Sequence, residues 1–387
     1  MQEIYLDNAS TSFPKAEGVA EEIYRFIKER SCNVNRGGYR MAYSAEETVF
    51  RTRQMLAELF HGSDGRNVVF TKNVTESLNI LLKGFLHAGD HILVSAMEHN
   101  AMMRPLQQLA KQGVAFDRIP CREDGSLMVE EMESLLRPNT RAVAMLHASN
   151  VCGTVMPVQR VGDFCQQHGL TFMMDSAQTA GILPIDMERM HIDALAFTGH
   201  KSLLGPQGIG GFIVKEHLVS QIEPLLSGGT GSISHTEDIP PFMPDRFEAG
   251  TMNLPGIIGL NAALRFLHEQ GSETIYQHEI TLTKRFLDGI KTIPNLRIIG
   301  KQSTEGRVGV VSILPEGIDP ALMADALGRE YGIMVRVGLQ CAPNAHRVLG
   351  TYPTGTIRFS FGYRSTEEEV DIAVAALREL CRRTVWN

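Results

Sequence analysis

The sequence lacks the features that mark membrane proteins and nucleic-acid-binding proteins. No apolar run is long enough to cross a bilayer, and no Lys- or Arg-rich run stands out against a formal net charge of −7. We therefore expect no membrane span and no nucleic-acid partner. Residues 1–7 show no basic region followed by an apolar stretch, so we expect no signal peptide and a cytoplasmic protein.

Cysteine is also scarce, and its spacing excludes the common paired motifs. The six cysteines are scattered along the chain, and none of them forms a CxxC pair. Without an export signal, we expect all of them to be reduced thiols.

The chain does contain enough apolar material for a large globular fold. It has 387 residues, 43% of them hydrophobic and 21% charged, which favours a globular protein of two domains. From Asn67 to Phe197, apolar runs alternate with helical patterns, which is typical of parallel strands with crossover helices on both faces. The expected strands are 68–70, 91–95, 114–119, 142–146, 171–175, 194–197 and 209–214, and the expected helices are 17–29, 46–60, 75–86, 101–112, 130–136 and 158–168.

The second half of the chain has a different pattern. Ser227 to Asp245 is rich in Gly, Ser and Pro and predicts a long loop. Beyond Pro255 the expected helices are 257–269, 273–290, 320–331 and 367–385, and the expected strands are 308–314 and 356–361. We therefore expect residues 1–255 to form an N-terminal arm and a large domain, and residues 256–387 to form a small α+β domain.

Lys201 is the first candidate for chemistry. The apolar strand 194–197 ends at Thr198-Gly199-His200-Lys201, and a second apolar run resumes at Ile209. A lysine held in an apolar site loses proton affinity, because burial disfavours the charged form. A neutral amine can attack an aldehyde and form a Schiff base, so Lys201 could tether pyridoxal phosphate (PLP). The alternative is a loop lysine without chemistry.

Two further residues follow the ends of expected strands. Asp175 ends strand 171–175, where open α/β sheets bind ligands, and an anion there would keep a pyridine nitrogen protonated. Its alternative role is to cap a helix. His99 follows strand 91–95 and could stack on a planar ring or move protons, or could simply be a hydrogen-bonded loop residue.

A phosphate site is expected where Asn73 to Glu76 opens a helix after strand 68–70. The backbone N–H groups of this helix start, with the Thr75 hydroxyl, could hold a phosphate. Plain helix capping is the alternative.

Cys341 and Arg358 are the candidates in the second half. Cys341 lies in a loop between Gly338 and Pro343, where nearby Arg336 could activate it as a nucleophile, although free cysteines are more often small buried hydrophobes. Arg358 lies in an otherwise apolar strand, which suggests capture of a carboxylate by the guanidinium, or a structural ion pair.

Together these residues resemble a known family. The match runs in order from Tyr5 to Gly362 and is similar to the class V aminotransferase group of fold-type I PLP-dependent enzymes, above all its cysteine desulfurase and selenocysteine lyase branch. Six motifs carry it: Glu98-His99, Ala148 to Thr154, Asp175 to Gln178, Thr198 to Pro206, Arg246 to Thr251 and Arg336 to Pro343. The resemblance implies a large domain with a mainly parallel sheet between helices, and a smaller C-terminal domain.

The resemblance also implies a role for each residue. Lys201 would bind PLP covalently and move protons, while Asp175 would pair with the ring nitrogen, Gln178 would touch the ring oxygen and His99 would stack on the ring. The phosphate would be held by Val74, Thr75, Thr198 and His200, joined by Thr251 from the second subunit of a homodimer. Asn150 and Arg358 would bind the substrate carboxylate.

The activity implied is that of a cysteine desulfurase. Cys341 would take sulfur from L-cysteine as a persulfide, leaving L-alanine, and pass the sulfur to an acceptor protein. A selenocysteine lyase or a cysteine/cystine C–S lyase is the alternative, whereas Cys341 argues against an aminotransferase, which needs no thiol. The short interval from Cys341 to Arg358 resembles group II desulfurases, but Leu339 and Gln340 stand where that group often has histidines.

Overall fold

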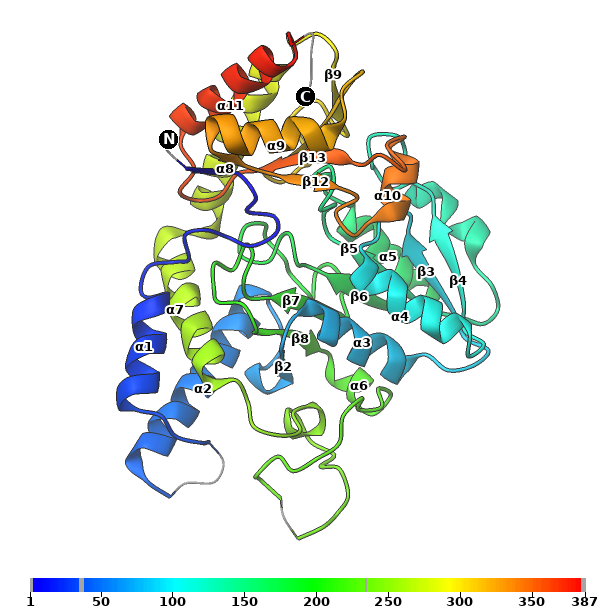
Figure 1. The fold of residues 1–387 in the computed structure, drawn as a ribbon. Helices are drawn as coiled ribbons and strands as arrows, with labels where there is room; N and C mark the ends of the chain where they lie inside the picture. The colour runs from blue at the N-terminus through cyan, green and yellow to red at the C-terminus, as the bar shows by residue number, and fades with distance from the viewer. Residues whose placement is uncertain (1–2, 35–37, 234, 384–387) are drawn as a thin grey trace.

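A seven-stranded sheet forms the centre of the larger unit (Figure 1) in this computed structural model, which describes residues 3–34, 38–233 and 235–383. The strand order is β2-β8-β7-β6-β5-β3-β4. Strands β7, β6, β5, β3 and β4 run parallel, and β8 runs antiparallel to both of its neighbours, so the sheet is mainly parallel, as expected. The strand bounds are β2 Val68–Thr71, β3 His91–Ser95, β4 Ala115–Ile119, β5 Thr140–Leu146, β6 Thr171–Asp175, β7 Ala194–Thr198 and β8 Gly210–Val214.

Helices cover both faces of this sheet because successive strand residues point to opposite faces. In β3, Leu93 packs into one core cluster, while Ile92 and Val94 pack into another. Helices α2, α5 and α7 add to the first cluster, and α3 and α4 add to the second. The helix bounds are α1 Val19–Glu29, α2 Arg40–Leu59, α3 Val74–Phe85, α4 Asn100–Ala110, α5 Val158–His168, α6 Glu216–Val219 and α7 Leu254–Gln270.

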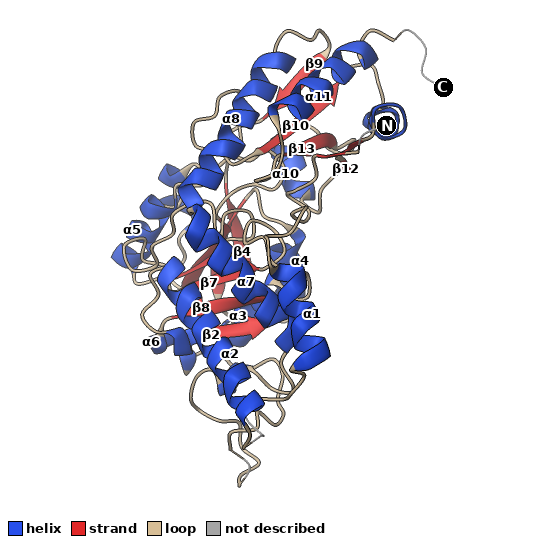
Figure 2. Ribbon diagram, turned by 90° about the vertical axis from the view of Figure 1, so that its left-hand side faces the viewer, coloured by secondary structure: helices blue, strands red, loops and turns tan. Residues whose placement is uncertain are grey.

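The second unit is built on a four-stranded antiparallel sheet, which Figure 2 shows at one end of the molecule. Its order is β12-β13-β10-β9. Helices α8, α9 and α11 bury a third core cluster against it, which includes Phe286 and Phe359. The bounds are α8 Ser272–Ile290, β9 Leu296–Ile299, β10 Val310–Pro315, α9 Pro320–Tyr331, β12 Arg336–Gly338, α10 Pro343–Val348, β13 Thr356–Ser360 and α11 Glu367–Leu380.

The N-terminal arm belongs to both units. Strand β1 (Ile4–Tyr5) pairs in parallel with β11 (Ile333–Met334), and Ile4 and Leu6 pack into the third cluster. The chain then runs down to α1 beside the larger unit (Figure 1). This arm therefore passes the place where the two units meet.

Several expected elements differ from the structure. Residues 130–136 form two 3₁₀ turns, Val129–Glu131 and Glu133–Leu135, because this short segment meets Pro138 before a stable α-helix can form. Helix α2 begins six residues before the expected Glu46, because it buries the small residues Ala42 and Ala45, which give a weak apolar signal. Helix α11 ends at Leu380, short of the expected Val385, which lies outside the described residues.

Two loop segments can also be compared with the expectations from the sequence. Apart from residue 234, the segment between Ser227 and Asp245 contains no helix or strand, as expected. The polar residues 33–39, between the expected helices 17–29 and 46–60, predict a loop, and residues 35–37 of it lie outside the described part. No helix of the described chain is both long and apolar enough to cross a membrane.

Candidate active site

The carboxyl ends of the parallel strands bring the expected site residues to one edge of the sheet. Glu98 and His99 follow β3, Asn150 follows β5, Asp175 ends β6 and Lys201 follows β7. Asp175 is the register partner of Leu146 on one side and of Ala196 on the other. These loops therefore meet where open α/β sheets bind ligands.

Lys201 lies at the centre of this edge, with the residue as a whole partly exposed and its amine buried. Burial lowers its pKa to about 8, and the charges of Asp175, Arg358 and Cys341 also act on it. Lys201 also lines a small hollow of about 30 Å³ together with Gln178. This placement supports the buried lysine expected from the sequence.

Asp175 is 5% exposed and lies close enough to Lys201 for the two charges to interact. Burial raises its pKa, while the backbone N–H of Ala177, at 2.8 Å from Oδ1, and the charge of Lys201 oppose this rise. The alternative role, a helix cap, is wrong, because the described chain has no helix between β6 and β7 and the Ala177 contact closes a turn. Gln178 is buried nearby and donates from Nε2 to the Ala9 carbonyl at 3.1 Å.

His99 caps the start of α4. Its Nδ1 accepts from the backbone N–H of Ala101 at 3.0 Å, which leaves the ring proton on Nε2. Burial, with the positive charges of Lys201 and Arg358, lowers the pKa of His99 to about 4. The ring is therefore neutral at physiological pH, which suits a residue that stacks on another ring.

The expected phosphate residues lie at one corner of the sheet. Thr198 is the register partner of Gly210, and a Cβ on Gly210 would lie 2.8 Å from the Cα of Asn73, the cap of α3. Val74 and Thr75 begin this helix, so their N–H groups face the same corner. Among the described residues, Thr198 Oγ1 and His200 Nδ1 are buried without a hydrogen-bond partner.

These observations test whether PLP fits. A helix start, two unsatisfied polar atoms and a buried lysine beside an aspartate match the phosphate, the aldehyde and the ring nitrogen of PLP. Thr251 is exposed and lines a hollow of about 210 Å³ with Thr71 and Lys72 of the same chain. The donor set of this corner therefore fits the group.

Arg358 is buried, and its guanidinium donates three hydrogen bonds within the chain. It donates to the Asn150 carbonyl at 2.9 Å, to Asp7 Oδ1 at 2.9 Å and to Ser10 Oγ at 2.7 Å. Its Nε–H has no partner within the described chain. The structural ion pair that was the alternative is thus present, and the Nε–H remains as a buried donor for a ligand. Asn150 donates from Nδ2 to the Gln340 carbonyl at 2.8 Å.

Cys341 is exposed on a tight turn between β12 and α10. The reading of a small buried hydrophobe is therefore wrong. Its carbonyl accepts from the backbone N–H of Asn100, next to His99, at 2.8 Å. This contact places the turn of the small unit against the carboxyl edge of the large sheet.

Two residues had no assigned role in the sequence. Glu98 is 1% exposed, and its Oε1 accepts from Ser95 Oγ at 2.5 Å and from the Leu146 N–H at 3.0 Å, which ties β3 to β5 beside Asp175. Burial raises its pKa to about 8. Asp7 pairs with Arg358 across the whole chain. Glu98 lies within one of the six motifs and Asp7 lies within the matched range from Tyr5 to Gly362, but no local pattern indicates their partners.

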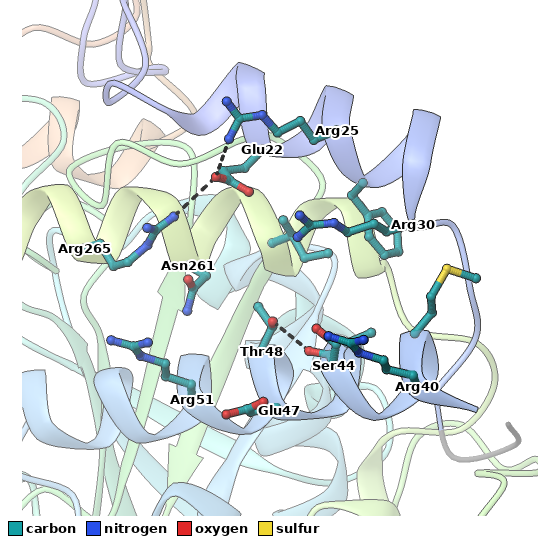
Figure 3. A pocket seen from close by; sticks show the side chains of 14 residues that line it. Glu22, Arg25, Arg30, Arg40, Ser44, Glu47, Thr48, Arg51, Asn261 and Arg265 are labelled. Carbon is teal, nitrogen blue, oxygen red and sulfur yellow. Dashed lines mark hydrogen bonds and ion pairs between the residues drawn. The ribbon is translucent and has the colours of Figure 1, made fainter. Parts of the chain in front are cut away.

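A much larger hollow of about 730 Å³ lies elsewhere, between α1, α2 and α7 (Figure 3). Five arginines line it, namely Arg25, Arg30, Arg40, Arg51 and Arg265. None of the site residues described above borders it, so its size does not make it the active site.

The mainly parallel sheet, with a buried lysine and aspartate at its carboxyl edge, defines the fold-type I class of PLP-dependent enzymes. Within that class, the model of the family described as aminotransferase class-V matches residues 4–372, and the chain belongs to this family.

Similar proteins indicate which branch of the family this chain resembles. A probable cysteine desulfurase of Pyrococcus abyssi is 33% identical, with 98% of this chain and 94% of the relative covered. A probable cysteine desulfurase of Mycolicibacterium paratuberculosis is 32% identical over 97% of this chain, which spans only 55% of that relative. The solved cysteine desulfurase of Thermococcus onnurineus superposes with a TM-score of 0.90 at 32% identity, covering 98% of this chain and 95% of the other.

Proposed function

We propose that this chain is a PLP-dependent cysteine desulfurase, which converts L-cysteine to L-alanine and passes the sulfur to an acceptor. The observation that carries this proposal is that an exposed thiol, Cys341, lies within electrostatic range of the buried Lys201 amine. The thiol comes from the small unit and the amine from the large one. Transamination needs no thiol, so this pairing favours sulfur transfer.

The proposed PLP site uses residues from four strand ends. Lys201 would hold the aldehyde carbon, Asp175 the ring nitrogen and His99 the ring face. The start of α3, with Val74 and Thr75, would hold the phosphate together with Thr198 and His200. Gln178 Nε2 would donate to the ring oxygen in place of the Ala9 carbonyl. When bound, PLP supplies an electron sink that weakens bonds at the substrate carbons next to its amine.

The substrate carboxylate would lie between Arg358 and Asn150. The Nε–H of Arg358 is buried without a partner in the described chain, and the amide nitrogen of Asn150 carries a second N–H beyond the one given to Gln340. A carboxylate would satisfy both donors. This binding orients the substrate sulfur for the next step.

Cys341 would take the sulfur as a thiolate. Its Sγ forms a bond to the sulfur of L-cysteine while the carbon–sulfur bond breaks, and the carbon keeps that electron pair and gains a proton. The products are L-alanine and a persulfide on Cys341. Lys201, whose pKa of about 8 lies near neutrality, is suited to hold and deliver protons at Nζ.

The remaining assignments are also proposals. We propose a large domain of residues 1–255 and a small domain of residues 256–387, a homodimer in which Thr251 reaches the second subunit, and a cytoplasmic location. The exposure of Cys341 supports access by an acceptor protein. The separate core cluster of the small unit supports a division of the chain into two units, although helix α7, which contains residues 256–270, packs into the first cluster of the larger unit.

Replacing Lys201 with Ala tests the PLP site. We expect the purified wild-type protein to show the visible absorbance of lysine-bound PLP and the Lys201→Ala variant to lack it. A wild-type protein that stays colourless after PLP is added would contradict the proposal.

Replacing Cys341 with Ala tests the sulfur step. We expect this variant to keep its visible absorbance and to lose sulfide release from L-cysteine under reductant by about 100-fold or more. Normal turnover in Cys341→Ala would favour a C–S lyase, and this is checked by scoring alanine against pyruvate with cysteine, selenocysteine and cystine.

A further inference from the structure

Four buried side chains behind the Cys341 turn form a connected hydrogen-bond network. His346 Nε2 lies 2.8 Å from Gln340 Oε1, and His346 Nδ1 lies 2.7 Å from Thr351 Oγ1. Gln340 also donates from Nε2 to the Thr356 carbonyl at 3.0 Å. These four residues are at most 5% exposed, so water does not compete for their contacts.

One arrangement of protons fits this network. The Thr356 carbonyl can only accept, which assigns the amide nitrogen of Gln340 to that side and leaves Oε1 facing His346. His346 must then donate from Nε2 and accept at Nδ1 from the Thr351 hydroxyl. Burial lowers the pKa of His346 to about 4, so the ring is neutral, as this arrangement requires.

The network acts on Cys341 through the backbone. Gln340 directly precedes Cys341, and both residues have left-handed backbone angles, with φ of +39° and +58°. Residues with side chains disfavour this region, so the surrounding contacts must hold the turn in place. The Gln340 carbonyl accepts from Asn150 at 2.8 Å and the Cys341 carbonyl accepts from Asn100 at 2.8 Å, which fixes the turn on both sides.

We propose that Gln340 and His346 are positioning residues that fix the Cys341 thiol where it meets the substrate sulfur. This inference rests on the proposed function. Gln340 acts as a buried anchor immediately before the nucleophile, and His346 sets the orientation of that anchor. The histidine close to Cys341 thus belongs to α10, behind the turn. In group II desulfurases, histidines are instead often found just before the cysteine, where this chain has Leu339 and Gln340.

Two variants of His346 separate positioning from packing. His346→Gln brings an amide nitrogen close to the place of Nε2 and keeps donation to Gln340, whereas His346→Asn brings one close to Nδ1 and loses it. We expect kcat for sulfide release to fall about 10- to 100-fold in His346→Asn but by less than about threefold in His346→Gln, with an unchanged KM for L-cysteine. Gln340→Met should behave like His346→Asn.

The matched control is His278→Asn, because His278 makes one ring contact, to the Ser365 carbonyl at 2.9 Å, away from the site. Thr351→Val replaces the hydroxyl with a methyl group and should lower kcat several-fold, with PLP content unchanged. Equal kcat in His346→Gln and His346→Asn, or losses that follow Tm and PLP content, would overturn the inference. A wild-type protein that releases neither sulfide nor alanine from L-cysteine would remove the proposed function, and the inference with it.

Discussion

Burial lowers the pKa of two lysines, Lys201 and Lys15, to about 8. At pH 7.5 about a quarter of such amines are neutral, against roughly one in a thousand for an ordinary lysine. Lys15 donates to Thr11 Oγ1, to Ser12 Oγ and to the His200 carbonyl, and these contacts hold its nitrogen in place. No such contact holds Lys201 within the described chain, so its amine is the one free to react.

A pH prediction follows for Lys201. Only the neutral amine attacks an aldehyde, so the rate of PLP incorporation into the apo-protein should rise with pH, with a midpoint near pH 8, the pKa of the buried amine, and should level off about one pH unit higher. Asp175 raises this pKa, so Asp175→Asn should move the midpoint to lower pH. Stopped-flow absorbance between pH 6 and 10.5 measures the midpoint, Lys15→Met should leave it unchanged, and a midpoint near 10 would contradict the assignment.

The contact between β8 and the start of α3 decides the shape of the phosphate corner. A Cβ on Gly210 would lie 2.8 Å from both the Asn73 Cα and the Phe197 carbonyl, so no other residue lets the helix start approach the sheet this closely. We expect Gly210→Ala to cost about 1–3 kcal/mol of stability and to weaken PLP binding about tenfold, because α3 must shift.

The control for this element is Gly228→Ala, because its added Cβ would have only an ordinary contact, 3.5 Å from the Ala249 Cβ. Thermal unfolding and a PLP titration followed by absorbance measure the two effects. A lower Tm with unchanged PLP affinity would place the phosphate away from the start of α3.

The helices and strands also show how much of the fold the sequence can predict. The bounds of β3, β6, α5 and α9 match the expected ones, because apolar periodicity reports which face of an element is buried. Periodicity does not name the partner of a residue, so the antiparallel direction of β8 and the pairing of β1 with β11 could not be predicted. For the same reason the motifs indicated Cys341 and Arg358 but not the Gln340–His346 contact.

At the scale of the whole molecule, the N-terminal arm joins the two units. Strand β1 pairs with β11, and a few residues later Thr11 and Ser12 donate to the His200 carbonyl beside Lys201. Between these contacts, Asp7 pairs with Arg358, whose side chain is 3% exposed. The N-terminal arm and strand β13 of the small unit therefore meet directly at the site, and folding of the arm is coupled to the order of the pocket.

The Asp7–Arg358 pair makes this coupling measurable. Asp7→Ala leaves a buried guanidinium without its counter-ion, so we expect a loss of about 3 kcal/mol in the free energy of unfolding, read from urea denaturation. The double variant Asp7→Ala/Arg358→Met should recover part of this loss, because no unpaired charge remains buried. Asp288→Ala, which breaks exposed pairs with Lys284 and Lys291, is the control and should leave the midpoint nearly unchanged. If Asp7→Ala behaves like this control, the arm is held by its other contacts, and the ion pair does not couple the arm to β13 at the site.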